Sequence, residues 1–429
     1  MYRCCWLLIF LLSILSLHNR TVRAATDRYL TDDAYQALAA DGWTKDEIRK
    51  EEQSQRNRSR PYVSHRAQKA LRQAKIDPRK AWLPDGAEAP RRDPASKPAQ
   101  RKEPVKTPRA LTADAPSGFG AKTRGGTGQR VFVVTRDGDS GSGTLRAAIT
   151  TANRSGGIIQ FKGSMDIEIR DSLTLTGSKI TIDGLSAGNE GVTIWADRLP
   201  RSRGNLVVEG SHIVVRGLRI RNGGDGILIR NGAHHVVIDW VTVTAPGDGG
   251  IDITRGSHDI TVQRCYIAGA GIPGQSGGGG AMLIKYGGTT NVSVHRNYFH
   301  NNLRRCPTAE GDGTFVDIRN NVVANSLQSH IQIRNGASAN LIGNVFIGCK
   351  STAVSLTGRF HQSDNHAPSQ KLPKSTSKAL PAPSVETLPA RKVLRLVTSQ
   401  AGAPLNDLDR AYRKCTSYQQ ARNIKAKSP

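Results

Sequence analysis

The segments 291-NVSVHRNYF-299, 315-FVDIRNNVV-323 and 338-SANLIGNVF-346 repeat one pattern. In each segment apolar residues alternate with polar ones, and an asparagine recurs at intervals of 24 and then 23 residues: Asn297, Asn321 and Asn344. The register continues backwards through three earlier segments, with one interval of 32 residues and others of 23 or 24: 259–267, 235–243 and 212–220. A period of this length, filled by short alternating stretches, indicates a solenoid in which each repeat is one turn.

The repeat predicts an all-β fold, a parallel β-helix over residues 118–353. Alternation at period two directs side chains in turn into and out of the coil, and identical amides stacked one strand apart can bond to one another as an asparagine ladder. A further strand is predicted in each turn, at 226–230, 250–254, 281–285 and 330–334.

The start of the ordered body predicts a capping helix. In 131-VFVVTRDGDSGSGTLRAAITTA-152 the strand-like alternation changes to a short helical period after Gly143. A helix that follows the first strand would cover the open end of the solenoid and protect its edge.

The N-terminal flank divides into three predicted parts. Residues 1–24 have the short positive start, the apolar run and the small-residue cleavage site of a signal peptide. Residues 25–55 are predicted to be a short helical segment, in which Thr44 and Glu47 have the spacing of a capping box. Residues 56–117 are basic, contain proline and have few large apolar residues, which predicts a flexible linker. The linker is either a solvated spacer or a binding arm.

The C-terminal flank is predicted in two parts. Residues 354–392 are rich in Ser, Pro and Lys and are expected to form a linker. Residues 393–429 return to apolar periodicity, and we expect this segment to pack back on the β-helix.

The charge of the chain favours an acidic partner. The formal net charge is +26, yet between residues 118 and 353 only 25 Lys and Arg face 17 Asp and Glu, so the flanks carry most of the excess. Such a field attracts polyanions. The predicted export and the few aromatic residues disfavour nucleic acid, and no later segment is long enough to span a membrane. The charge leaves an anionic lipid or an acidic polysaccharide as the partner. We expect the mature protein to be secreted and to be a monomer.

Four cysteines remain after the predicted cleavage: Cys265, Cys306, Cys349 and Cys415. An even number in an oxidising compartment permits two disulfides, and the three possible pairings stay open. The spacing is too wide for a zinc motif.

Three aspartates are candidate metal ligands. Asp248 and Asp252 lie four residues apart in 246-PGDGGIDIT-254, and Asp225 lies 23 residues before Asp248, or one turn back. Carboxylates on adjacent turns would form an oxygen-rich site that suits Ca²⁺. The alternative is that aspartates beside glycines only form turns.

Several segments resemble the pectate lyase family, polysaccharide lyase family one. They occur in the family's order across about residues 118–353 and the tail: 131-VFVVTRDGDSGSGTLRAAI-149, 180-ITIDGLSAG-188, 212-HIVVRGLRIRNGGDG-226, the Asp248–Asp252 pair, 293-SVHRNYFHNNLRRCP-307, 317-DIRNNVV-323 and 401-AGAPLNDLD-409. The resemblance implies a right-handed β-helix and a Ca²⁺-dependent lyase that cleaves polygalacturonate by β-elimination. It places calcium ligands at Asp225, Asp248 and Asp252.

The resemblance also assigns the remaining site residues. Arg305 matches the arginine that the family uses as its catalytic base, and Arg304 and Lys285 are expected to contact substrate carboxylates. Two departures remove positive charge: the usual substrate lysine is missing from 274-GQSGGGGAM-282, and Glu310 stands where the family has a second arginine. Two alternatives therefore stay open, a non-catalytic protein that binds an acidic glycan and a lyase for a different uronan.

Overall fold

The structure is a computed structural model that describes residues 116–188, 190–197, 199–272, 279–349 and 354–425, together with Leu38, Thr44, Glu47 and Leu71. By its contacts the chain divides into two units, one of residues 1–111 and 429 and one of residues 112–428. In the described part, no helix has both the length and the apolar character needed to cross a membrane.

Little of the first unit is described. The predicted signal peptide lies outside the described residues, as does the predicted linker apart from Leu71, Pro116 and Ser117. Thr44 and Glu47 do form the predicted capping box: the backbone N–H of Thr44 donates to Glu47 Oε2 at 2.8 Å, and that of Glu47 donates to Thr44 Oγ1 at 3.3 Å.

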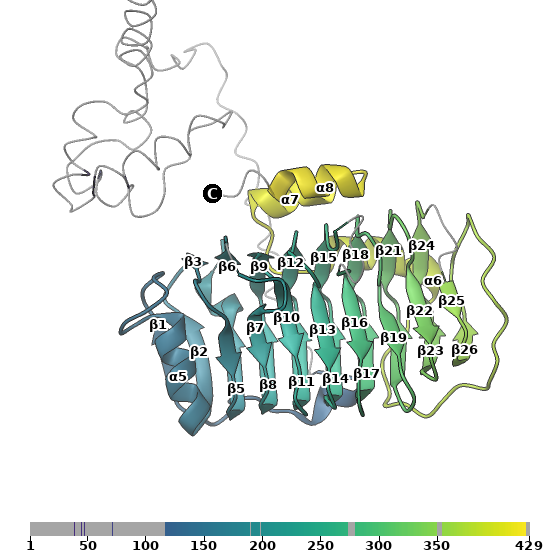
Figure 1. Ribbon diagram of the computed structural model, residues 1–429, viewed down its shortest axis with the longest axis horizontal. Coiled ribbons are helices and arrows are strands. Elements are labelled where there is room, and N and C mark those ends of the chain that lie inside the picture. Colours follow the sequence, from purple (N-terminus) through teal and green to yellow (C-terminus); the bar gives the residue numbers. More distant parts are fainter. Residues whose placement is uncertain are drawn as a thin grey trace, which may run out of the picture. The chain divides into compact units, whose positions relative to one another are not determined.

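The second unit is a parallel β-helix made of three sheets (Figure 1). The ten-stranded sheet contains, in spatial order, β1 (Val131–Val134), β2 (Gly157–Phe161), β5 (Ser178–Asp183), β8 (Ser211–Arg216), β11 (His234–Asp239), β14 (His258–Gln263), β17 (Thr290–His295), β20 (Phe315–Arg319), β23 (Ser338–Ile342) and β26 (Arg359–Ser363). The β4–β25 sheet contains β4 (Leu173–Leu175), β7 (Gly204–Val208), β10 (Asp225–Ile229), β13 (Ile251–Thr254), β16 (Met282–Lys285), β19 (Thr308–Glu310), β22 (Ile331–Arg334) and β25 (Val354–Leu356). The β3–β24 sheet contains β3 (Met165–Glu168), β6 (Val192–Ala196), β9 (Leu218–Asn222), β12 (Thr242–Thr244), β15 (Tyr266–Ala268), β18 (Tyr298–His300), β21 (Val322–Ala324) and β24 (Val345–Ile347).

Inward apolar rows hold the coil together. One row in the ten-stranded sheet joins residues that are each fully buried: Ile213, Val236, Ile260, Val292, Val316 and Ala339. Burying an aliphatic side chain of this size stabilises the fold by roughly 1.5–3 kcal/mol. The parallel β-helix predicted from the alternation is confirmed.

Each repeated nine-residue segment forms two strands rather than one. The chain bends just before the position at which the asparagine recurs in the repeat. The residues at the bend in three turns are Arg264, Arg296 and Asn320, with φ values of 52°, 57° and 51°. This left-handed conformation re-aims the backbone from the ten-stranded sheet into the β3–β24 sheet.

The asparagine ladder stabilises this bend. Asn297 Nδ2 donates to Asn321 Oδ1 at 3.0 Å, and Asn321 Nδ2 donates to Asn344 Oδ1 at 3.0 Å. Each of the backbone N–H groups of Asn297 and Asn321 also donates to the next asparagine oxygen. The ladder is confirmed, and it extends one turn further, to Asn365.

The predicted capping helix is α5 (Leu145–Ser155). Its N-cap Thr144 accepts a hydrogen bond from the N–H of Ala147, and its apolar face buries Leu145, Ile149 and Ala152. Two short 3-10 helices, η1 (Phe119–Lys122) and η2 (Gly184–Ala187), lie beside the ten-stranded sheet.

The boundary predicted at residue 353 is wrong. Strands β25 and β26 continue the coil, and the segment that follows is bonded to it: Leu380 donates its N–H to Asn340 Oδ1 and Leu388 donates to Asn320 Oδ1. The polar composition concealed these strands because the last turn of a solenoid has an exposed face.

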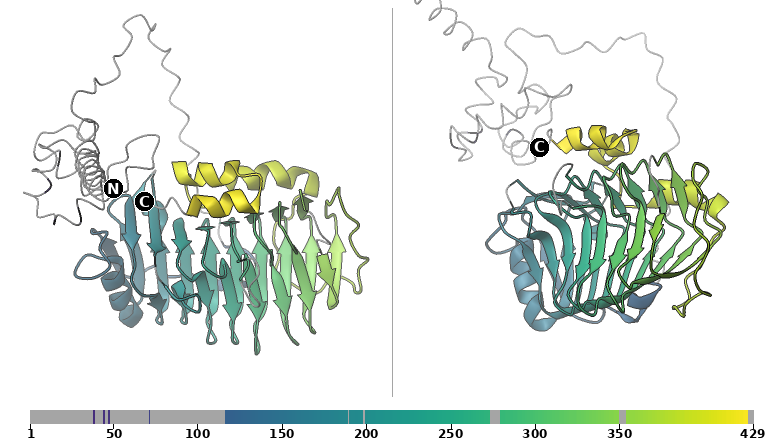
Figure 2. Two further views of the ribbon diagram at one scale, coloured as in Figure 1. Left: turned by 45° about the horizontal axis from the view of Figure 1, so that its top comes forward. Right: turned by 45° about the vertical axis from the view of Figure 1, so that its right-hand side comes forward.

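Three helices close the chain: α6 (Ala390–Gln400), α7 (Asp407–Lys414) and α8 (Tyr418–Lys425). Figure 2 shows them in yellow along the β3–β24 sheet. Their buried side chains form one apolar cluster with that sheet, including Val393, Tyr412, Tyr266 and Tyr298.

No disulfide is present among the described residues, because all four cysteines are free thiols. The two disulfides that the even count permits are therefore not formed. Cys265 Sγ lies against the carbonyl of Gln263 at 3.2 Å, and Cys306 Sγ lies 3.2 Å from Ser326 Oγ. The buried pair thus behaves as small core residues that bond locally.

Candidate functional site

The candidate site lies on the outer face of the β4–β25 sheet, where Asp252 is a strand residue of β13. Its register partners are Leu228 and Leu283 on the neighbouring turns, and the Leu283 N–H donates to Asp252 Oδ1 at 3.1 Å. Its carboxylate lies over Gly249, since a Cβ at that position would come within 2.6 Å of Oδ1. Glycine is needed here because any side chain would occupy the space of the carboxylate.

Asp225 is the first residue of β10, one turn earlier. Its Oδ1 accepts a hydrogen bond of 2.7 Å from the N–H of Gly249. Ile227 pairs with Ile251, so the true step between these turns is 24 residues and Asp225 is level with Gly249. The sequence spacing predicted a separation of 23 residues between these turns, which would have placed Asp248 level with Asp225, so this prediction was one residue too short.

The two carboxylates are buried close enough to oppose each other's ionisation. Burial, followed by the negative charge of Asp252, raises the pKa of Asp225 to about 9. Burial also raises the pKa of Asp252 to about 7, against the positive charge of Arg305. A positive charge placed beside such a buried carboxylate stabilises its ionised form.

Asp248 is held differently. Its Oδ1 accepts a 2.5 Å hydrogen bond from the Gly279 N–H and a 3.1 Å ion pair from Arg201 Nη2. Within the described ranges, no three acidic, histidine or cysteine side chains converge to hold a metal. The structure thus brings Asp225 and Asp252 together, while Asp248 is a neighbour turned toward a guanidinium.

Arg305 lies close to both buried carboxylates. It is half-buried, has a φ of 60°, and lowers the pKa of both Asp225 and Asp252 by its charge. Its side chain packs over Gly280, where a Cβ would lie 2.7 Å from Arg305 Cβ. To the residues that the structure describes, Arg305 makes no side-chain hydrogen bond or ion pair, so its guanidinium is not engaged in holding the fold.

The other two predicted residues differ from each other. Arg304 Nε donates to the Gly279 carbonyl at 3.1 Å, and burial followed by the charge of Arg305 lowers its pKa. Lys285 Nζ forms a 2.7 Å ion pair with Glu310, which also binds Arg334 at 2.9 Å. Lys285 is thus part of a row of charges along the sheet rather than a cation with no partner.

The carboxylate oxygens of this site suit Ca²⁺ as ligands. Asp225 and Asp252 each have one oxygen bonded to a backbone N–H, and no described donor bonds to Oδ2 of either residue. Hard carboxylate oxygens are the preferred ligands of Ca²⁺, which takes six to eight oxygens in all. Two buried carboxylates would supply part of that set, and Asp248, water or a substrate carboxylate would complete it.

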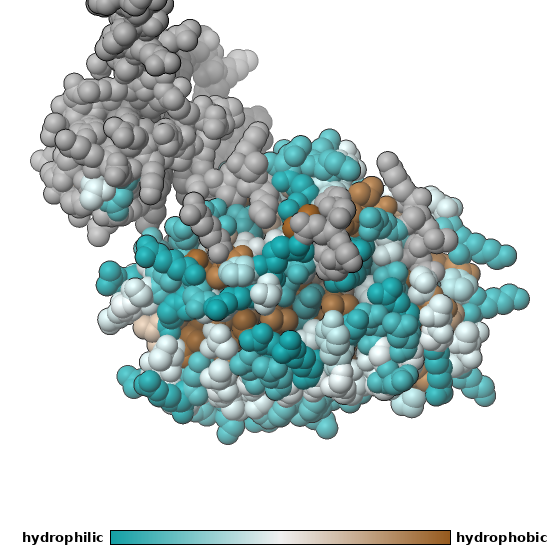
Figure 3. Space-filling model, viewed as in Figure 1, coloured by the Kyte–Doolittle hydropathy of each residue, from teal (hydrophilic) through white to brown (hydrophobic). Residues whose placement is uncertain are grey.

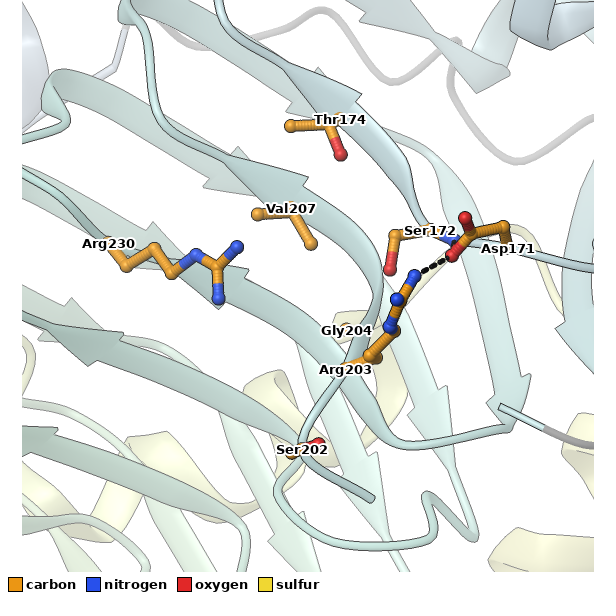
Figure 4. A pocket seen from close by; sticks show the side chains of 8 residues that line it. All are labelled: Asp171, Ser172, Thr174, Ser202, Arg203, Gly204, Val207 and Arg230. Carbon is orange, nitrogen blue, oxygen red and sulfur yellow. Dashed lines mark hydrogen bonds and ion pairs between the residues drawn. The ribbon is translucent and has the colours of Figure 1, made fainter. Parts of the chain in front are cut away.

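A hollow of about 420 Å³ lies on the same sheet, toward its first turns (Figure 4). It is lined by Asp171, Ser172, Thr174, Ser202, Arg203, Gly204, Val207 and Arg230. Both of its arginines are already in ion pairs, Arg203 with Asp171 and Arg230 with Glu209. Figure 3 shows that the face seen in Figure 1 is largely hydrophilic with apolar side chains along its middle.

Two features of this molecule were missed from the sequence. One is Arg201, whose loop position gives no periodic signal. The other is a group of stacked imidazoles, with ring centroids 5.1 Å apart for His234 and His258 and 4.7 Å apart for His212 and His235. Its signal was available, because these pairs are separated by 24 and 23 residues, the length of one turn.

Parts of the chain are similar to known proteins. The family described as "Right handed beta helix region" matches residues 204–366. "Probable pectate lyase C" of Aspergillus terreus is 34% identical over 252 residues, which is 56% of this chain and 55% of that protein. Over this span the chain is similar in sequence to a protein named as a pectate lyase.

Other pectate lyase relatives are similar over shorter or equal spans. "Probable pectate lyase C" of Emericella nidulans is 34% identical over 248 residues, 56% of this chain and 54% of that protein. "Probable pectate lyase 6" of Arabidopsis thaliana is 36% identical over 180 residues, 37% of this chain and 38% of that protein. The chain spans about half the length of the fungal relatives it matches.

Among solved structures, the chain is similar to the major allergen from cedar pollen, with a TM-score of 0.49 and 20% identity over 68% of this chain and 93% of that one. It is also similar to a pectate lyase from Bacillus sp. N165 in complex with trigalacturonate, with a TM-score of 0.49 and 17% identity over 67% of this chain and 99% of that one.

Proposed function

We propose that this protein is a secreted, calcium-dependent lyase that cleaves polygalacturonate by β-elimination and acts as a monomer. The observation that carries the proposal is the placement of the buried Asp225–Asp252 pair beside the Arg305 guanidinium on an outer face of the β-helix. The relatives named as pectate lyases support the reaction class. The predicted signal peptide at residues 1–24 supports secretion.

Asp225 and Asp252 would hold the ion, with Asp248 beside them. When bound, Ca²⁺ supplies positive charge that draws electron density from the uronate carboxylate and makes the proton on C5 more acidic. Arg305 removes that proton, the C–H electron pair forms the C4–C5 double bond, and the C4–O bond breaks. The departing oxygen then takes up a proton.

An arginine base needs alkaline conditions, because guanidinium is protonated at ordinary pH. The Asp225–Asp252 pair also favours activity at higher pH. In the metal-free chain the pKa of Asp252 is raised to about 7 and that of Asp225 to about 9, so both carboxylates ionise, and become able to bind Ca²⁺, as the pH rises through this range. Activity is therefore expected to increase with pH above 7.

The test incubates the full chain with polygalacturonate and follows the ultraviolet absorbance of the unsaturated product, before and after EDTA and after return of Ca²⁺. Product is expected with Ca²⁺ and not after EDTA. Arg305→Lys is expected to lower turnover by about 100-fold or more, the usual contribution of a positioned base. The matched control is Arg296→Lys, which also has a positive φ but lies at another corner of the coil.

A second function, binding of an acidic glycan without cleavage, is favoured by one observation. Lys285 is paired with Glu310, which stands where the family has an arginine, so the usual substrate cations are reduced. Binding of polygalacturonate without product would establish this function in place of the lyase. Neither binding nor product would point to a different uronan, and Arg305→Lys with substantial residual turnover would remove Arg305 from the role of base.

A further inference from the structure

Arg201 is a cation that the chain itself places at the carboxylate site. It lies in the loop before β7, and its Nη2 contacts Asp248 Oδ1 at 3.1 Å. The two side chains are partly exposed, at 39% and 27%, so the ion pair can open without unfolding the coil.

The loop that carries Arg201 is held against the start of β10. A Cβ at Gly224 would lie 1.8 Å from the Arg203 carbonyl oxygen and 2.5 Å from that of Pro200, so only glycine allows this approach. The Asp225 N–H also donates to the Arg203 carbonyl at 2.9 Å. These backbone contacts fix the loop beside Asp225 and direct Arg201 across that turn to Asp248.

The ion pair divides the three carboxylates into two kinds. Asp248 has a guanidinium partner and the Gly279 N–H on one oxygen. Asp225 and Asp252 have only backbone donors, and the described residues contain no group of three ligands arranged for a metal. Both donors contact Oδ1 of Asp248, so a divalent ion that bound all three carboxylates through their other oxygens would lie close to the positive charge of Arg201.

We propose that Arg201 is a built-in competitor that keeps Asp248 out of the metal site and so sets the calcium affinity of the protein. The inference rests on the proposed function only in that Asp225 and Asp252 hold the ion. Because like charges repel, Arg201 held against Asp248 lowers the affinity of this carboxylate for Ca²⁺, and a bound Ca²⁺ in turn weakens the Arg201–Asp248 ion pair.

The experiment titrates Ca²⁺ into the metal-free full chain by calorimetry, without polysaccharide. Arg201→Gln is expected to bind Ca²⁺ about fivefold more tightly, the size of effect expected when a partly exposed ion pair no longer competes. Arg203→Gln is the matched control, since it lies in the same loop but pairs with Asp171, and its affinity is expected to stay that of the natural chain. Thermal unfolding checks that each variant is folded.

A second pair of variants makes the assignment specific. In an Asp248→Asn background, Arg201→Gln is expected to change the calcium affinity by less than about twofold, because the competition acts through Asp248. Equal or weaker binding by Arg201→Gln in the natural chain would overturn the inference alone, provided that the natural chain binds Ca²⁺. If neither the natural chain nor Arg201→Gln binds Ca²⁺, the inference and the assignment of the metal site both fail, whatever a lyase assay shows.

Discussion

Buried carboxylates in two regions of this β-helix have opposite surroundings. Asp409 in α7 is fully buried, but Arg219 Nε contacts its Oδ2 at 2.6 Å and Arg221 Nη2 contacts its Oδ1 at 2.9 Å. Asp225 and Asp252 on the β4–β25 sheet are almost as buried, yet they have single backbone donors and each other's charge.

The difference separates a structural carboxylate from the pair that we propose to hold calcium. Asp409 has its full complement of donors, including the Asn406 N–H in a capping box, and it fixes the C-terminal helices to β9. Neither carboxylate of the Asp225–Asp252 pair is bonded to a cationic side chain. The fold tolerates this cost because other contacts stabilise the coil. Burial alone therefore does not distinguish the two regions, whereas burial without a bonded guanidinium does.

The largest expected effect is on the satisfied carboxylate. Asp409→Asn should reduce the free energy of unfolding by about 3–5 kcal/mol, because it leaves Arg219 buried without a counter-charge. Chemical denaturation measures this loss. The matched control is Asp407→Asn, since Asp407 is fully exposed in the same helix and should change stability little. A loss of less than about 1 kcal/mol for Asp409→Asn would contradict the claim that Asp409, unlike the Asp225–Asp252 pair, stabilises the fold through buried ion pairs.

The opposite sign is expected for the functional pair. Asp225→Asn should raise the free energy of unfolding of the metal-free chain by about 2 kcal/mol at alkaline pH, because it removes a buried charge that lacks a partner. The folded-state pKa of Asp225 is raised, so the stability that its protonated form contributes is present at low pH and is lost as the pH rises toward about 9. The gain should therefore shrink on acidification, and destabilisation at alkaline pH would contradict it.

A smaller effect is expected from a buried histidine outside both regions. Burial, followed by the charge of Arg296, lowers the pKa of His295 to about 3. The unfolded chain then binds a proton that the folded chain does not, so stability falls as the pH drops below about 6.5. His295→Gln should reduce the loss of stability between pH 7.5 and 5.5 by about 1 kcal/mol, as measured by denaturation at the two pH values. An unchanged loss would show that His295 is not a source of acid sensitivity.

The fold could be predicted from the sequence because each turn of a solenoid repeats the same pattern of residues at a regular interval. The asparagines at 297, 321 and 344 gave the ladder, and the alternation gave the buried rows. The last turn was missed although Asn365, 21 residues after Asn344, continued the ladder, because β26 itself is polar.

The candidate site could be predicted only in part. The period brought Asp225 close to Asp252, and motif resemblance supplied Arg305. The Arg201–Asp248 ion pair could not be predicted, because it depends on how a non-repeating loop packs on Gly224. The pairing of Lys285 with Glu310 follows from the register of β16 and β19.

The most direct test of the central claim is calorimetric titration of Ca²⁺ into the metal-free chain at alkaline pH, comparing the natural sequence with Asp252→Asn. The natural chain should bind one ion, and Asp252→Asn should bind it at least about tenfold more weakly because a buried carboxylate ligand is lost. Equal affinity in the two proteins would contradict the claim that the carboxylate pair on the β4–β25 sheet is a calcium site.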